Sequence, residues 1–220
     1  MFGNNPLLAP ETGDGTHLKV HSIFNTIQGE GPHSGTPAIF IRLSGCNLAC
    51  TFCDTEFDQY NHMNIDKILS TVQALSPDYK RLIVLTGGEP FRQPISLLCQ
   101  ELLNLNFQVQ IESNGLLYRM IPQQVEVVCS PKNVGNGYSI IRADLLTHVI
   151  AVKFLISATN KLYSNIADVG QFANNIKTYV QPMDEYDHDK NSANIALAIE
   201  LAQKHNAILS MQLHKILSIP

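Results

Sequence analysis

Residues 37–53 read PAIFIRLSGCNLACTFC, and this stretch decides the fold. Its first seven residues, 37–43, are almost continuously apolar, which is typical of a parallel strand buried on both faces. Three cysteines, Cys46, Cys50 and Cys53, follow behind a Ser-Gly turn. Barrels of alternating strands and helices place their chemistry in the loops after the strands. The stretch therefore predicts a buried strand whose carboxyl end carries a cysteine-rich site.

Apolar runs and helical periodicities alternate through the rest of the chain. Further strands are predicted at Leu18–Phe24, Arg81–Leu85, Phe107–Ile111, Val125–Cys129, Val149–Ile156 and Ile176–Val180. Apolar residues at three- and four-residue spacing predict helices within residues 65–75, 95–105, 162–176 and 195–202. The polar residues 184–191 are predicted to form a loop, and an apolar segment at 208–213 closes the pattern.

Strands that alternate with helices form βα units around a parallel sheet, so the predicted fold class is α/β. About six such units within 220 residues are too few for a complete eightfold barrel, which usually takes ~250 residues. An incomplete (partial) TIM-like βα barrel fits this length. We expect one domain over residues 17–220, preceded by a flexible N-terminal arm over residues 1–16, which lack apolar periodicity.

The composition argues against several classes of protein. Lysine and arginine number 15 against 19 acidic residues, so the net charge is −4 and the basic surface that nucleic-acid binding needs is absent. No apolar run approaches the roughly 18 to 20 residues that cross a bilayer. The N-terminus lacks the basic and apolar regions of a secretory signal. We therefore expect a cytoplasmic protein with no nucleic-acid or membrane partner.

The clustered cysteines form the motif C-x3-C-x2-C, for which three interpretations exist. The total of five cysteines is odd, and in a chain that is not exported this argues for thiols or metal ligands rather than disulfides. A structural zinc ion would need a fourth protein ligand, for which His62 is the best candidate. An iron–sulfur cluster on three thiolates would leave one iron open to a ligand from outside the protein. Three free thiols are the third interpretation. The tight spacing favours the cluster, whereas Cys99 and Cys129 are expected to be packing residues.

The cysteine motif resembles the signature of the radical S-adenosylmethionine (SAM) superfamily, in which three cysteines bind a 4Fe–4S cluster and SAM binds the fourth iron. Residues 86–90, Thr-Gly-Gly-Glu-Pro, follow the next predicted strand and resemble a second motif of that superfamily. Glycine at such a position lets backbone groups approach a ligand closely. The resemblance implies a partial barrel of the radical SAM type, with a 4Fe–4S cluster and SAM as cofactors.

Further motifs resemble one family within that superfamily, the 7-carboxy-7-deazaguanine synthases. They are Gln28-Gly29-Glu30-Gly31, Cys53-Asp54-Thr55, Ser130-Pro131-Lys132, Gln181-Pro182-Met183-Asp184, Gln212-Leu213-His214-Lys215 and Pro220. The resemblance implies a carbon–nitrogen lyase that contracts 6-carboxy-5,6,7,8-tetrahydropterin to 7-carboxy-7-deazaguanine with loss of ammonia, in the biosynthesis of queuosine and related 7-deazapurines. It also implies a homodimer, a bound Mg2+ ion and an external one-electron reductant of the flavodoxin or ferredoxin type.

The same resemblance implies roles for individual residues, although it assigns no general base. The cluster ligands would be Cys46, Cys50 and Cys53, and Thr55 would bind Mg2+. The SAM site would comprise Phe52, Cys53, Asp54, Gly88, Ser130, Pro131, Lys132, Gln181, Pro182, Met183 and Asp184. The pterin site would comprise Ile27, Gln28, Gly29, Arg42, Thr86 and Pro220, with Glu30 and His214 as weaker additions.

Three of the polar residues can be weighed without the resemblance. Arg42 interrupts an apolar strand, where an unpaired guanidinium is costly, so it either forms an ion pair, with Glu112 as candidate, or grips a substrate carboxylate. Lys153 poses the same question, and there a network inside the barrel is favoured. Thr55 alone would be interpreted as a helix cap, yet an oxygen ligand to a hard cation is chemically reasonable.

Three other kinds of protein are compatible with the cysteine motif. Another radical SAM enzyme, such as a glycyl-radical activating enzyme, would not require the Mg2+ site or turn over the carboxypterin. A non-catalytic iron–sulfur electron carrier would ligate its cluster fully and would not respond to SAM. A zinc-stabilised binding module is the third rival, and metal analysis separates it from the others.

Overall fold

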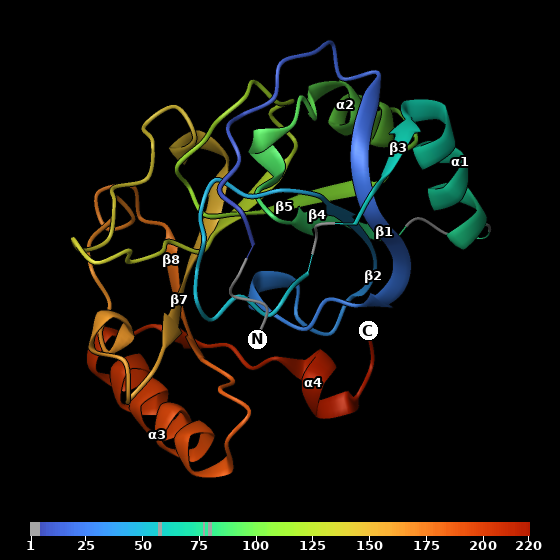
Figure 1. Ribbon diagram of the computed structural model, residues 1–220. Coiled ribbons are helices and arrows are strands. Elements are labelled where there is room, and N and C mark those ends of the chain that lie inside the picture. Colours follow the sequence, from blue (N-terminus) through green and yellow to red (C-terminus); the bar gives the residue numbers. More distant parts are fainter. Residues whose placement is uncertain (1–4, 57–58, 77, 79–80) are drawn as a thin grey trace.

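The computed structural model describes residues 5–56, 59–76, 78 and 81–220, which form one nine-stranded sheet with helices packed on its outer side (Figure 1). The strands are β1 His17–Ile27, β2 Pro37–Leu43, β3 Asn61–Asn64, β4 Leu82–Gly87, β5 Gln108–Ser113, β6 Glu126–Cys129, β7 Val149–Ile156, β8 Lys177–Pro182 and β9 Ile208–Leu209. The α-helices are α1 Ile65–Leu75, α2 Ser96–Asn104, α3 His188–His205 and α4 Leu213–Leu217. This arrangement confirms the predicted α/β class.

The strand order is β3-β1-β2-β4-β5-β6-β7-β8-β9. β1 pairs antiparallel with both β2 and β3, and every pairing from β2 to β9 is parallel. β3 and β9 form the two edges, so the sheet is an open barrel, as the chain length predicts. The carboxyl ends of the parallel strands lie at one rim, which is where such barrels carry their chemistry.

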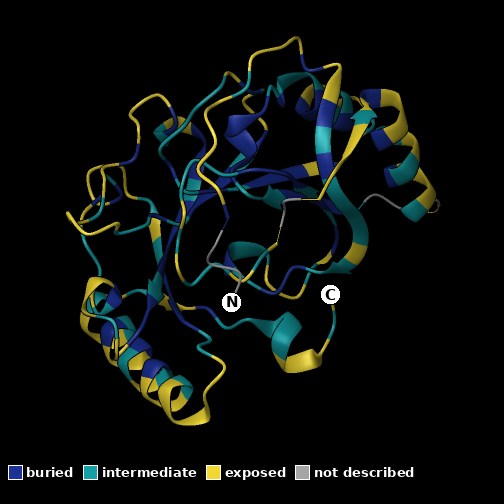
Figure 2. Ribbon diagram, viewed as in Figure 1, coloured by how far each residue is buried: buried dark blue, intermediate teal, exposed yellow. Residues whose placement is uncertain are grey.

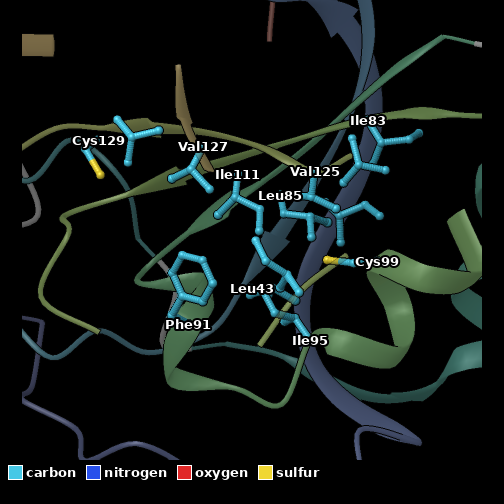
Figure 3. Packing of buried hydrophobic residues seen from close by; sticks show 14 of the residues in the cluster. Leu43, Ile83, Leu85, Phe91, Ile95, Cys99, Ile111, Val125, Val127 and Cys129 are labelled. Atoms are coloured by element: carbon cyan, nitrogen blue, oxygen red, sulfur yellow. The ribbon is translucent and has the colours of Figure 1, made fainter. Parts of the chain in front are cut away.

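The two-residue period of the strands separates the core from the inner face of the barrel. On β2, Ile39, Ile41 and Leu43 face the helices and are fully buried, whereas Arg42 faces the other way. Figure 3 shows this outer layer, in which Leu43, Ile83, Leu85, Phe91 and Ile111 belong to one buried cluster. Cys99 and Cys129 lie in the same cluster with no exposed surface, as predicted for packing residues. Polar residues of the parallel strands are thereby left on the inner face.

Local capping explains where the two longer helices begin. The Asn64 side chain accepts a hydrogen bond from the Lys67 amide (2.8 Å) and caps α1. Asp187 caps α3 by accepting from the amides of Asp189 and Lys190, both at 3.0 Å. The predicted loop at residues 184–191 is therefore a loop only as far as this cap. Figure 2 shows α3 with one buried stripe against the sheet and one exposed face.

The predicted helix over residues 162–176 is wrong. The structure has only a short 3-10 turn at Lys161–Tyr163, followed by loops that lead into β8. Asp168 accepts from the Gly170 amide (2.9 Å), and Asn174 donates to the Gly170 carbonyl (2.7 Å). Gly170 itself has φ +108°, which no helix allows. Short polar side chains that bond to the local backbone compete with a helix, and here they outweigh the apolar spacing.

Residues 5–16, predicted to be a flexible arm, make defined contacts in the structure. The Leu8 amide donates to the Cys46 carbonyl (2.8 Å), and the Glu11 amide donates to the Arg92 carbonyl (2.7 Å). In Figure 1 the dark-blue N-terminal trace runs beside the cyan loop that follows β2. These residues therefore cover part of the rim rather than projecting from it.

Within the described part of the chain, no helix is both long enough and apolar enough to span a lipid bilayer.

Candidate functional site

The cysteine loop is held against the end of β4 by two adjacent glycines. The Gly88 amide donates to the Leu43 carbonyl and the Glu89 amide to the Gly45 carbonyl, each at 3.0 Å. A Cβ atom on Gly88 would lie 1.9 Å from the Gly45 carbonyl oxygen, and one on Gly87 would lie 2.1 Å from that of Leu43. The glycine pair is thus required for close approach of two protein segments, in addition to the approach to a ligand that the motif predicts.

A cavity of about 230 Å³ opens at the carboxyl rim, next to the cysteine loop. Its lining includes most of the residues predicted for the cluster, SAM and Mg2+. These are Cys46, Cys50, Phe52, Cys53, Asp54, Thr55, Gly88, Ser130, Lys132, Gln181, Met183 and Asp184. The parallel strands bring them together because each strand ends at this rim.

A second cavity, of about 280 Å³, adjoins the first. It is lined by seven of the eight residues predicted for the pterin, namely Ile27, Gln28, Glu30, Arg42, Thr86, His214 and Pro220. Both cavities share the side chains of Glu30, Asp54, Thr55, Thr86, Glu112 and Lys215. The two cavities are therefore adjacent.

Three predicted residues do not line either of these cavities. Gly29 packs under His214, and a Cβ atom there would lie 2.4 Å from the imidazole Nδ1, so its role is to let that side chain approach. Pro131 and Pro182 lie next to lining residues in the chain and alternate with them. Pro182 contributes to a third hollow, beside α3. Pro131 and Pro182 therefore contribute to the path of the backbone.

A buried charge network connects the two cavities. The Lys153 ammonium, 5% exposed, is paired with Glu30 and lies 3.2 Å from Glu112 Oε2. Gln212 donates to Glu30 (2.9 Å), and Gln110 donates to Glu112 (2.8 Å). This is the network predicted for Lys153. Glu112, which was considered as an ion-pair partner for Arg42, therefore pairs with Lys153 instead.

The pKa values of the network follow from burial and charge. Burial raises the pKa of Glu30, but the attraction of Lys153 and its hydrogen bond outweigh that effect and lower the pKa to about 2. Burial leaves the pKa of Glu112 raised, although Lys153 opposes the shift. Burial acts to lower the pKa of Lys153, yet the two carboxylates hold it above its ordinary value. Two acids thus share the Lys153 cation at the wall between the cavities.

Arg42 projects into the second cavity from the inner face of β2. Its guanidinium carbon lies 5.2 Å from the centre of the Phe24 ring, and among the described residues its buried Nε has no hydrogen-bond partner. Burial lowers its pKa, and the charge of Asp54 opposes that shift. A guanidinium with a free donor at a cavity wall favours the second of the two predicted interpretations, a site for a carboxylate ligand.

Lys215 ties the end of the chain to the cysteine loop, a role that the sequence did not reveal. Its ammonium lies 3.4 Å from Asp54 Oδ2 and 3.1 Å from Asp184 Oδ2. Both acids were predicted for the SAM site, so the lysine bridges two walls of the first cavity. Asp54 also accepts a hydrogen bond from the Thr55 hydroxyl (3.3 Å).

Glu89 is the other residue that sequence reasoning missed. It is 1% exposed and accepts from the Ser113 hydroxyl (2.9 Å) and the amides of Asn114 (2.8 Å) and Phe91 (3.1 Å). Burial raises its pKa to about 7 against these hydrogen bonds. The motif Thr-Gly-Gly-Glu-Pro contained the signal, because a glutamate between an apolar strand and a proline is placed to bond to the neighbouring turn.

The cysteine thiols fit a cluster better than a single ion. All three are free and half-buried around the first cavity. Burial raises the pKa of Cys46 to about 12 and also raises that of Cys50, so iron would have to displace their protons. Among the described residues, no three His, Cys, Asp or Glu side chains converge on one point where an ion could sit. The thiolates of a cluster bind separate irons, so they lie farther apart around it than the ligands of a single ion do.

Comparisons with known proteins agree with this donor set. The model of the radical SAM superfamily matches residues 40–135. The 7-carboxy-7-deazaguanine synthase of Rickettsia prowazekii (strain Madrid E) is 54% identical, over 100% of this chain and 96% of its own length. The synthase of the same description from Bacteroides thetaiotaomicron is 34% identical, over 91% of this chain and 98% of its own.

A solved structure gives the same result for the fold. The crystal structure of QueE from Escherichia coli superposes with a TM-score of 0.70 at 26% sequence identity, covering 89% of this chain and 94% of that one. The similarity thus covers most of the chain rather than the cysteine loop alone.

Proposed function

The chain belongs to the 7-carboxy-7-deazaguanine synthase family of radical SAM enzymes, and from that premise we propose that its two adjoining cavities hold the cofactors and the pterin side by side. The enzyme is a ring-contracting lyase that forms 7-carboxy-7-deazaguanine from 6-carboxy-5,6,7,8-tetrahydropterin, with loss of ammonia, in queuosine biosynthesis. The main observation in support is the shared wall, because the same residues line both the proposed cofactor cavity and the proposed pterin cavity.

The first cavity would hold the 4Fe–4S cluster and SAM. Cys46, Cys50 and Cys53 supply three thiolates, which leaves one iron without a protein ligand. When bound, the reduced cluster and SAM supply the one-electron chemistry that removes a hydrogen atom from the substrate. The chain itself holds SAM in place. Lys132, half-buried at the cavity wall and bonded to the Ser130 hydroxyl (2.6 Å), offers its positive charge to the SAM carboxylate.

The second cavity would orient the pterin. The free donor of Arg42 fits the substrate carboxylate, since a planar guanidinium can bind it through two hydrogen bonds. Glu30 and Glu112 belong to the shared wall, where Lys153 keeps Glu30 ionised and opposes the effect of burial on the pKa of Glu112. Carboxylates there can accept hydrogen bonds from the amino and ring N–H groups of the pterin. The positive and negative ends of the cavity would thus fix the direction in which the substrate binds.

Mg2+ would bind at Thr55, which lines both cavities. A hard cation that keeps several waters needs few oxygens from protein and takes the rest from ligands. Asp54 lies beside Thr55 and supplies negative charge to the ion, since Lys215 is shared between Asp54 and Asp184. In that position the ion would hold the substrate carboxylate together with Arg42.

We further propose that the enzyme acts in the cytoplasm as a homodimer and receives its electron from a flavodoxin- or ferredoxin-type protein, as the family resemblance implies. Sedimentation analysis of the anaerobically purified protein tests the dimer. Replacing a chemical reductant with reduced flavodoxin or ferredoxin tests the electron donor.

The decisive experiment is an anaerobic turnover assay. The protein is reconstituted with iron and sulfide and incubated with SAM, a reductant, Mg2+ and the carboxypterin. Mass spectrometry should then detect the ring-contracted product, and omission of Mg2+ should lower its yield. Cleavage of SAM without any ring-contracted product would contradict the substrate assignment, and a yield independent of Mg2+ would contradict the role of Thr55.

A further inference from the structure

The N-terminal residues 5–11 form a strap across the outside of the cysteine loop. Leu7 pairs with Cys46 in a parallel bridge, and the Leu8 amide donates to the Cys46 carbonyl at 2.8 Å. Cys46 is the first residue of the cluster motif, so the strap bonds directly to the backbone of a proposed ligand.

A buried arginine fastens the strap and the cysteine loop to the same point. Arg92 is 2% exposed and donates to the Ala9 carbonyl (3.2 Å) on the strap and to the Ser44 carbonyl (2.9 Å) before the cysteines. It also pairs with Glu11 at 2.7 Å, and Glu11 pairs in turn with Lys19 at 2.8 Å. Because Arg92 is buried, breaking its pair with Glu11 would leave its charge uncompensated, which favours one geometry of the strap.

Asn5 reaches the other end of the cysteine loop. Its side chain is 6% exposed, lines the first cavity and donates from Nδ2 to the Thr55 carbonyl at 3.0 Å. The Cys53 thiol lies 3.4 Å from the same carbonyl oxygen. One strap therefore contacts the backbone at Cys46 and again at Thr55, the first and last positions of the segment that carries all the proposed metal ligands.

We propose that Asn5 is a positioning residue, which fixes the backbone at Thr55 and thereby sets the geometry of the segment 46–55 for the cluster and for Mg2+. The inference rests on the proposed roles of the cysteines and Thr55. It adds that the strap is part of the site and that Asn5 acts by donating one hydrogen bond. Because the bond is nearly buried, water cannot easily replace it.

The test uses Asn5→Ala and Asn5→Asp, the second of which keeps the shape of the side chain but removes the donor. The matched control is Asn25→Ala, because Asn25 makes the same kind of bond, to the Leu75 carbonyl (3.2 Å), from an exposed position in β1. Hydrogen exchange of the metal-free protein comes first, since it does not depend on any cofactor. Both Asn5 variants should raise exchange in residues 46–55 by roughly three- to tenfold, the equivalent of one net hydrogen bond.

The second readout is the Mg2+ concentration that gives half-maximal turnover of the reconstituted enzyme. It should rise by a similar factor in both Asn5 variants and stay unchanged in Asn25→Ala. Unchanged exchange in residues 46–55 would overturn the proposal, whatever the activity shows. Faster exchange with an unchanged Mg2+ requirement would also overturn it, because Asn5 would then stabilise the loop without positioning the site. If the wild-type protein needs no Mg2+, the role of Thr55 fails instead, and that result is separate from the exchange data.

Discussion

Lys153→Met tests the buried charge network most sharply, because methionine keeps most of the apolar stem of the side chain and removes the ammonium. In the structure the lysine is 5% exposed and serves two carboxylates, Glu30 and Glu112, which are 19% and 17% exposed. Removal of one partner from a buried ion pair destabilises a protein by about 3–5 kcal/mol. A second estimate comes from Glu30, whose pKa falls from 4.5 to about 2, which corresponds to about 3 kcal/mol.

The effect should depend on pH with a definite sign. Glu30 has a lowered pKa, so its stabilisation is present above 4.5 and is lost as the pH falls toward 2. In the variant both carboxylates are buried without a cation, and burial raises their pKa values, so they take up protons as the pH falls. The stability difference between wild type and variant should therefore be largest near neutral pH and should shrink in acid.

Urea unfolding of the metal-free protein, kept reduced, measures this difference between about pH 5 and pH 8. Lys177→Met is the matched control, since Lys177 lies exposed at the start of β8, and it should change stability by less than ~0.5 kcal/mol. Adding Glu112→Gln to Lys153→Met should recover part of the loss. A difference below ~1 kcal/mol, or one that does not change with pH, would refute the description of these three residues as a buried charge network.

Three further substitutions test individual parts of the site. Cys50→Ala should abolish the cluster absorbance and turnover together while the metal-free protein remains folded by circular dichroism, and retention of a full cluster would contradict its assignment as a ligand. Arg42→Ala should leave the cluster spectrum intact and weaken pterin binding by about 2–5 kcal/mol. The dependence of turnover on pterin concentration measures this, and an unchanged affinity would show that Arg42 is structural. Gly88→Ala should lower iron incorporation and destabilise the protein by about 1–3 kcal/mol, because its new Cβ would overlap the Gly45 carbonyl. Iron content and urea unfolding equal to those of the wild type would show that the close approach is not required.

The sequence predicts β1, β2 and β4 to β8 because each is an apolar run, whereas β3, Asn61–Asn64, is polar and was missed. Side chains in a strand alternate with a two-residue period. The same period places Arg42 on the opposite face from Ile41 and Leu43, so the inner face of the barrel follows from the pattern alone. The cysteine loop and the glycine pair are also predictable, since both follow a strand end. The failed helix at 162–176 shows the limit of apolar spacing, because the Asn, Asp and Gly residues between the apolar positions bond to the local backbone.

Contacts between distant segments were beyond sequence reasoning. Nothing in the polar N-terminal residues indicates that Asn5 lies 3.0 Å from the Thr55 carbonyl, because the two are fifty positions apart. Lys215 pairs with Asp54 and Asp184 for a similar reason, since only the path of the last helix brings it to the rim. Glu112 could be recognised as a buried acid, yet its partner could be identified only when β5 and β7 had been placed.

The central claim is that three thiolates leave one iron of the cluster vacant and that SAM fills the vacancy. The most direct measurement is electron–nuclear double resonance of the reduced, reconstituted protein with SAM that carries a labelled amino nitrogen or carboxylate. If SAM binds the vacant iron, magnetic coupling between the cluster and the labelled atoms is expected. A cluster spectrum that SAM leaves unchanged, with no such coupling, would contradict it.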